Sequence, residues 1–79
     1  MKKIKIWLKI NPIIDSQNLF NGQETEVEVP YGITIQELLQ ELEMSTTGIL
    51  IIINGSVAEY SSKVYQGDHI YILPHLDGG

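Results

Sequence analysis

The sequence predicts an α+β fold, a roll in which one main helix packs on one face of a mixed β-sheet. Two early segments alternate strictly between apolar and polar residues, which indicates half-buried strands, and one later segment has the apolar spacing of an amphipathic helix. The 79 residues contain no cysteine and 43% apolar side chains, so a single packed core without disulfides is expected. Residues 1–79 therefore form one domain, with a flexible C-terminal tail over residues 75–79.

The first two predicted strands cover residues 3–10 and 24–29. The first places lysines on its outward side, and the second places glutamates there. Opposite charges on facing strands stabilise their pairing, so an antiparallel hairpin is expected. The connection over residues 11–23 contains four apolar side chains among polar ones, and it is expected to fold back on the domain as a packed loop or as one short helical turn.

The clearest helix begins at a T-x-x-E capping box formed by Thr34 and Glu37. Apolar residues then recur at helical spacing, and glutamines and glutamates occupy the opposite side. Ile33 can pack against Leu38 as a hydrophobic staple. These signals predict a helix over residues 35–43.

Three strands follow the helix. The β-branched run over residues 49–53 is closed by Asn54-Gly55, a tight-turn signal, and is expected to form a central strand. A short strand is expected around Val57, and a last strand over residues 69–73. The order strand, strand, helix, strand, short strand, strand is typical of the β-grasp type of roll.

Composition excludes several classes of partner and chemistry. The formal net charge is −5 and arginine is absent, so no nucleic-acid partner is expected. No apolar stretch is long enough to cross a membrane, and the absence of cysteine fits a reducing cytoplasm. The two histidines, His69 and His75, lack the spacing of a metal site, so no bound metal is expected.

The C-terminal third carries a family resemblance. Ile53-Asn54-Gly55, then Gly67-Asp68, a strand ending at Pro74 and a final Gly78-Gly79 together resemble the ThiS/MoaD-like sulfur carriers, which are ubiquitin-like proteins. The placement of Pro74 four residues before Gly78 is more similar to MoaD, the small subunit of molybdopterin synthase, than to ThiS, the thiamine carrier.

The resemblance implies a carrier rather than an enzyme, with no cofactor bound to the chain itself. The terminal carboxylate of Gly79 would be adenylated by a ThiF/MoeB-like enzyme that uses ATP and Mg, and then converted to a thiocarboxylate. A synthase large subunit or an equivalent acceptor would take the sulfur for cofactor biosynthesis, with molybdopterin expected before thiamine. Leu76, Asp77 and Gly78 would enter the partner's active site together with Gly79, since glycine backbones fit narrow channels.

The partner interface is expected on the outward face of the sheet. Trp7 stands among outward lysines, and Tyr71 and Leu73 share an outward parity near Pro74. An aromatic side chain within a polar rim is typical of interfaces. Two alternatives stay open: a ubiquitin-like modifier conjugated to lysines through Gly79, and a noncovalent ubiquitin-like binding domain.

Overall fold

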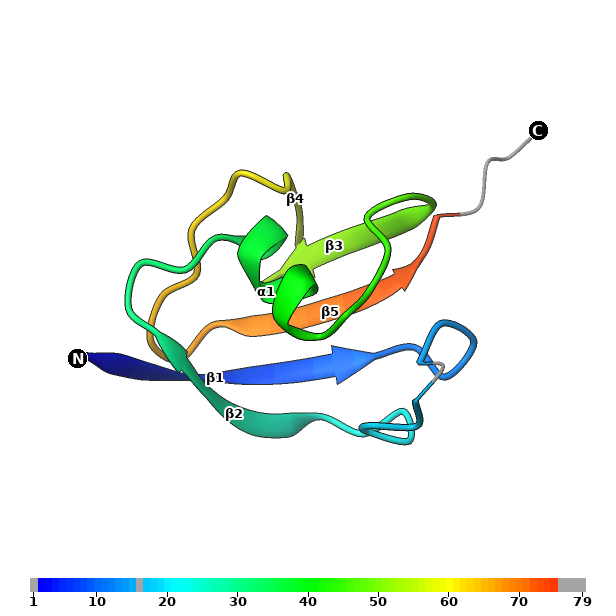
Figure 1. The fold of residues 1–79 in the computed structure, drawn as a ribbon, viewed down its shortest axis with the longest axis horizontal. Coiled ribbons are helices and arrows are strands. Elements are labelled where there is room, and N and C mark those ends of the chain that lie inside the picture. The colour runs from blue at the N-terminus through cyan, green and yellow to red at the C-terminus, as the bar shows by residue number, and fades with distance from the viewer. Residues whose placement is uncertain (1, 16, 76–79) are drawn as a thin grey trace.

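The computed structural model describes residues 2–15 and 17–75, which form a five-stranded sheet crossed on one face by a helix (Figure 1). The predicted β-grasp type of α+β fold is confirmed. Across the sheet the strands follow the order β2-β1-β5-β3-β4. The elements are β1 (Lys3–Ile10), β2 (Thr25–Pro30), α1 (Ile35–Glu41), β3 (Ile49–Ile53), β4 (Ser56–Ala58) and β5 (His69–Pro74).

The sheet is mixed because β5 pairs in parallel with β1 and antiparallel with β3. The predicted antiparallel pairing of β1 with β2 is confirmed, and Lys5 lies opposite Glu28. The ion pair between these strands joins residues that are not directly opposite each other, since Lys3 Nζ lies 3.9 Å from a Glu28 carboxylate oxygen. The expectation that residues 49–53 form a central strand is confirmed, since β3 is paired on both sides, by β5 and β4, and the middle position of the sheet is occupied by β5.

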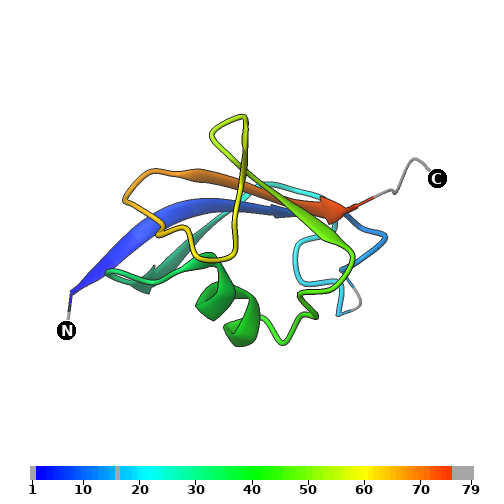
Figure 2. The ribbon, with the colours of Figure 1, turned by 90° about the horizontal axis from the view of Figure 1, so that it is seen from above.

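The core lies between α1 and the inner face of the sheet, and Figure 2 shows the helix on that side only. Ile6, Leu8 and Ile10 of β1 are fully buried, so the alternation in the sequence assigns the inner face of this strand correctly. Ile35 and Leu39 of the helix are buried equally deeply. None of the helices in the described part of the chain is long and apolar enough to cross a membrane.

The helix begins where the capping box predicts. The Glu37 N–H donates to Thr34 Oγ1 at 3.2 Å, and the Thr34 N–H donates to the Glu37 carboxylate at 2.9 Å. The staple residues Ile33 and Leu38 are both buried in the core. The helix ends at Glu41, two residues before the predicted end, because Glu43 adopts a left-handed conformation with φ of 56° that stops the helix.

The connection between β1 and β2 is a packed loop, and its described residues contain turns but no helix. Asp15 is buried, and its carboxylate accepts the N–H groups of Leu19 at 2.8 Å and Phe20 at 3.0 Å. The N–H of Phe20 lowers the pKa of Asp15 most strongly. The N–H groups of Leu19 and Asn21 act in the same direction, so this pKa lies below its ordinary value although burial acts to raise it. Asp15 therefore organises the loop as a charged acceptor.

Candidate functional site

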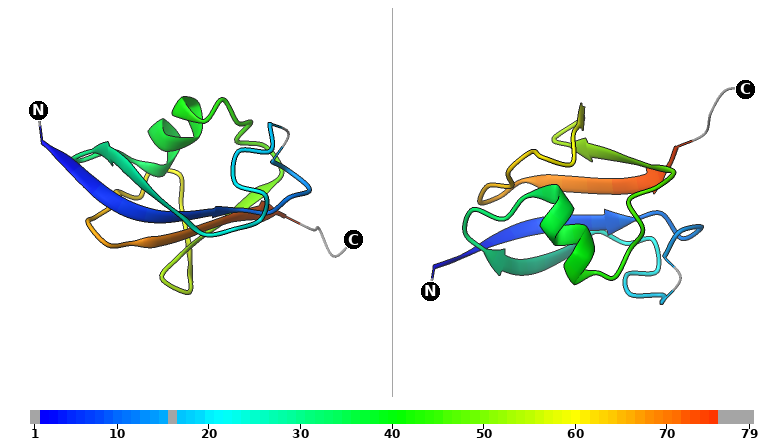
Figure 3. Two further views of the ribbon diagram at one scale, coloured as in Figure 1. Left: turned by 90° about the horizontal axis from the view of Figure 1, so that it is seen from below. Right: turned by 45° about the horizontal axis from the view of Figure 1, so that its top comes forward.

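The face of the sheet opposite α1 is not covered by a helix, as the left view of Figure 3 shows. The parallel register of β1 and β5 sets Trp7 opposite His69 and Lys9 opposite Tyr71 on this face. The predicted outward parity of Trp7 and Tyr71 is thus confirmed, since the intervening Ile70 and Ile72 are buried. Two distant segments of the sequence meet here.

Trp7 is half-buried because a second ring covers it. Its indole stacks on the imidazole of His69, with centroids 6.1 Å apart and planes inclined by 12°. His69 Nδ1 lies 3.0 Å from a carboxylate oxygen of Glu24. Sequence reasoning treated His69 and Glu24 as ordinary surface groups, and no local pattern links residues 45 positions apart. The contact holds Trp7 in a defined orientation on the outer face.

Tyr71 is held from two sides by β1 and the residue that follows it. Lys9 Nζ lies 5.0 Å from the centroid of the Tyr71 ring, and Asn11 Nδ2 donates to the Tyr71 hydroxyl at 3.2 Å. Leu73 and Pro74 follow at the end of β5, and both are half-buried. The four interface residues predicted from the sequence therefore lie on the strands β1 and β5, which are direct neighbours.

Strands β3 and β4 add apolar side chains that the sequence prediction missed. Leu50 lies opposite Leu73, and Ile52 lies opposite both Tyr71 and Val57. Val57 is 69% exposed. The unbroken apolar run in β3 conceals its alternation, so only the pairing reveals which side chains point outward. We call this surface the outer sheet face; it consists of Trp7, Leu50, Ile52, Val57, Tyr71 and Leu73.

The hydrogen-bonded sheet extends one residue beyond β5. Pro74 lies opposite Ile49, and the N–H of the exposed His75 donates to the Gly48 carbonyl at 2.9 Å. The predicted reactive residues Leu76, Asp77, Gly78 and Gly79 lie outside the described residues. What the structure establishes is the place from which they continue, at the end of β5 beside the outer sheet face.

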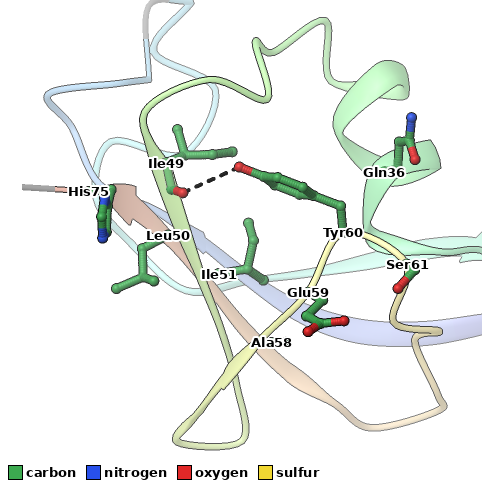
Figure 4. Close-up of a pocket in the computed structure, with 9 residues that line it drawn as sticks. All are labelled: Gln36, Ile49, Leu50, Ile51, Ala58, Glu59, Tyr60, Ser61 and His75. Carbon is green, nitrogen blue, oxygen red and sulfur yellow. Dashed lines mark hydrogen bonds between the residues drawn. The ribbon is translucent and has the colours of Figure 1, made fainter.

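A cavity of about 570 Å³ lies between α1, β3 and the segment after β4, with His75 at its border (Figure 4). The Tyr60 hydroxyl reaches across to the Ile49 carbonyl at 3.4 Å and also donates to the Thr46 carbonyl. In the view of Figure 4, Gln36 and His75 stand at opposite sides of the cavity. Tyr60 therefore ties the segment before β3 to the end of β4, which is a structural role.

The described residues provide no metal centre. Within residues 2–15 and 17–75, no three side chains among histidine, cysteine, aspartate and glutamate gather closely enough to hold an ion. Among the described residues, the carboxylate recorded beside the His69 imidazole is that of Glu24.

Solved structures similar to this chain share its fold. Small archaeal modifier protein 1 from Haloferax volcanii aligns with a TM-score of 0.71 at 15% identity, covering 92% of this chain and 99% of its own. A Pyrococcus furiosus protein provisionally named molybdopterin converting factor, subunit 1, aligns at 0.68 and 18% identity with the same coverage. ThiS from Geobacter metallireducens aligns at 0.59 and 23% identity, again covering 92% and 99%.

The family comparison is more specific than the shared fold. No curated protein matches the chain. The model of the ThiS family matches residues 13–79, which include β2, the helix, the later strands and the final Gly78-Gly79. The strand order, the uncovered outer sheet face and this match over most of the sequence lead to one assignment. The chain belongs to the ThiS family of ubiquitin-like, ThiS/MoaD-like proteins.

Proposed function

We propose that this protein is a sulfur carrier, and that the carboxylate of Gly79 is converted to a thiocarboxylate by partner enzymes in the cytoplasm. The observation that carries the proposal is the family match, because it extends through Gly78-Gly79. The chain itself supplies the terminal carboxyl group that receives the sulfur, and the recognition surface. A ThiF/MoeB-like enzyme supplies ATP and Mg.

The proposed chemistry has two steps. A terminal carboxyl has an ordinary pKa of about 3.3–3.7, so it is ionised at neutral pH and serves as a nucleophile rather than an electrophile. One carboxylate oxygen of Gly79 attacks the α-phosphorus of ATP and displaces pyrophosphate, which gives an acyl adenylate. A sulfide equivalent from a donor then attacks the acyl carbon, and AMP leaves with the bridging oxygen. Sulfur thereby replaces one oxygen, and no cysteine of this chain takes part.

The described geometry supports delivery of the terminus to a partner's active site. The N–H of His75 donates to the Gly48 carbonyl, so the hydrogen-bonded sheet reaches position 75, four positions before Gly79. A chain of four residues reaches at most about 14 Å when extended. Glycines at the last two positions suit a narrow channel, since they carry no Cβ. A partner must therefore hold the outer sheet face within this reach of its nucleotide site.

The outer sheet face is the surface proposed to hold that partner. Its aromatic groups are fixed before binding, Trp7 by His69 and Tyr71 by Lys9 and Asn11, so little side-chain freedom is lost on association. Leu73 and Pro74 continue this surface to the point where the chain leaves the sheet. Buried aromatic anchors within a polar rim commonly provide most of the binding energy of an interface.

Molybdopterin is the product that we place first, with thiamine second. The position of Pro74 relative to Gly78 and the similarity to the Pyrococcus furiosus converting-factor protein support this order. A synthase large subunit would then accept the sulfur. The similarity to a small archaeal modifier protein supports a second candidate, conjugation of Gly79 to lysines of target proteins.

Intact mass spectrometry of the protein from its native cell tests the proposal. A carrier shows replacement of one terminal oxygen by sulfur, whereas a modifier shows isopeptide adducts on other proteins. A chain that always carries an unmodified carboxylate, in cells that are making these cofactors, would contradict both candidates and leave a noncovalent binding domain. The same spectrum verifies that Gly79 is the last residue.

A further inference from the structure

A second cavity, of about 500 Å³, lies at the end of the molecule opposite the end of β5. It forms where the start of β1 meets the loop before α1 and the segment before β5, and Figures 1 and 3 show these three segments side by side. We call it the lysine–tyrosine pocket, and its defining residues are Lys2, Lys3, Tyr31, Lys63 and Tyr65. Nothing in the proposed carrier chemistry uses this pocket.

Backbone hydrogen bonds hold the walls of the pocket in place. The Tyr31 N–H donates to the Lys2 carbonyl at 3.0 Å, which joins the loop before α1 to the start of β1. The Val64 N–H donates to the Ile33 carbonyl at 3.0 Å, which joins the segment before β5 to the loop before α1. The floor contains Val64 and Ile4, which are 1% and 5% exposed. The pocket is therefore formed before any ligand arrives.

The charge around the pocket is opposite to the charge of the chain. The protein has twice as many acidic as basic residues, yet Lys2, Lys3 and Lys63, three of its five lysines, line this one cavity. Among the described residues that line it, none carries a carboxylate. Two carboxylates lie next to lining residues: Glu28 is 3.9 Å from Lys3 Nζ, and Asp68 accepts the N–H of Tyr65 at 2.9 Å. The lysines thus create a local positive field on an acidic protein, which favours an anionic partner.

The pocket also offers aromatic surface. Tyr31 and Tyr65 are 62% and 60% exposed, and they flank the cavity from different segments. Lys2 Nζ lies 4.7 Å from the centroid of the Tyr31 ring, so cation and ring already form one recognition unit. Tyrosine contributes a large contact area at a low entropic cost. The ligand that fits should carry an apolar group beside its negative charges.

We propose that the lysine–tyrosine pocket binds an acidic segment of a partner protein, with an apolar side chain between Tyr31 and Tyr65 and flanking carboxylates at the lysines. Lysine acts as a separate point charge, and the three lysines come from two segments far apart in the sequence, which suits carboxylates spread along a peptide better than one compact ion. The pocket lies beside the start of β5, whereas Leu73 and Pro74 lie at its end, so the pocket and the place where the chain leaves the sheet are at opposite ends of this strand.

The test is an NMR titration of the full chain with the blocked peptide Glu-Glu-Leu-Glu-Glu at low salt. Saturable shifts are expected at the amides of Lys3, Gly32 and Tyr65, and not on the outer sheet face. Because exposed charges interact weakly and are screened, we expect binding to weaken as salt is raised. Shifts that do not saturate, or that map elsewhere, would overturn the proposal.

Matched variants identify the groups responsible. The double variant Lys2→Gln, Lys63→Gln should raise the Kd about tenfold, which corresponds to about 1.4 kcal/mol, because two exposed charge pairs are lost. Lys9→Gln is the control, since Lys9 also lies over a tyrosine ring but at the other end of β1. An equal loss of peptide affinity in the control variant, or no loss of affinity in the double variant, contradicts the assignment.

The apolar part of the proposal has its own test. Tyr65→Ser should weaken binding of the leucine-containing peptide several-fold. It should leave the weak binding of inorganic phosphate unchanged. Unchanged amide spectra outside the pocket would verify folding, which is expected because the Tyr65 side chain is largely exposed. If phosphate alone competes as well as the peptide, or if Tyr65→Ser binds the peptide normally, the pocket is a simple anion site and the proposal fails.

Discussion

The indole of Trp7 stacks on the imidazole of His69, with ring centroids 6.1 Å apart, and thereby links neighbouring strands on the uncovered face of the sheet. One side of the indole is thus covered from within the protein, and the residue is half-buried rather than part of the core. Glu24 in turn lies 3.0 Å from the imidazole. The arrangement supports Trp7 as a fixed contact residue.

Trp7→Ala should therefore weaken partner binding more than folding. We expect the Kd for the cognate adenylating enzyme to rise at least about tenfold, and the free energy of unfolding to fall by about 1 kcal/mol, the value of an aromatic pair. Calorimetry and thermal melts measure the two effects. Lys5→Ala, on the same side of β1, serves as the control. A large loss of stability with normal binding would place Trp7 in the core.

Ile51 and Ile52 give a matched pair on opposite faces of β3. Ile51 is 1% exposed in the core, so Ile51→Ala should lower the free energy of unfolding by about 2–5 kcal/mol. Ile52 lies opposite Tyr71 on the outer sheet face, so Ile52→Ala should cost less stability and should weaken binding to the adenylating enzyme. Urea unfolding and calorimetry separate the two. Equal stability losses with unaffected binding would refute the assignment of faces.

Asp15→Asn should destabilise the loop between β1 and β2 in a pH-dependent way. The pKa of Asp15 is lowered in the folded protein, so its ionised form adds stability above the unfolded value of about 3.9, and this stability is lost as pH falls through the folded value. The variant should be less stable than the parent at pH 7, and the difference should narrow below about pH 4. Thermal melts across pH test this.

The control for the Asp15 prediction is Glu41→Gln, which removes an exposed carboxylate. This substitution should change stability little at any pH, because a solvated charge without backbone donors contributes little. A stability gap for Asp15→Asn that stays constant from pH 7 to below pH 4 would show that shape, and not charge, organises the loop.

Deleting Gly79, or adding one residue after it, should abolish adenylation and leave the fold intact. The reacting carboxylate must reach the α-phosphorus of ATP in line, and a misplacement of about 1 Å can cost about 10²-fold in rate. ATP–pyrophosphate exchange with the cognate enzyme is the measurement, and the amide spectrum verifies folding. Full exchange activity with the shortened chain would rule out the carrier mechanism.

Short-range signals were sufficient for most elements of the fold. The alternation in β1 identified its buried residues because successive side chains of a strand point to opposite faces. The capping box located the first turn of α1 because its hydrogen bonds join residues three positions apart. The end of the helix could not be predicted from these signals. The helix stops because Glu43 adopts a left-handed conformation, which hydrophobic periodicity does not predict.

The sequence by itself determined the element order, the inner residues of β1 and the family to which the C-terminal third points. Only the tertiary structure decided that β5 is the middle strand, which side of β3 faces outward, and that Trp7 meets His69. It also decided that lysines some sixty positions apart in the sequence, Lys2 and Lys3 with Lys63, line one pocket. The physical reason is that these features depend on pairing between segments far apart along the chain, whereas local patterns report only the preferences of neighbouring residues.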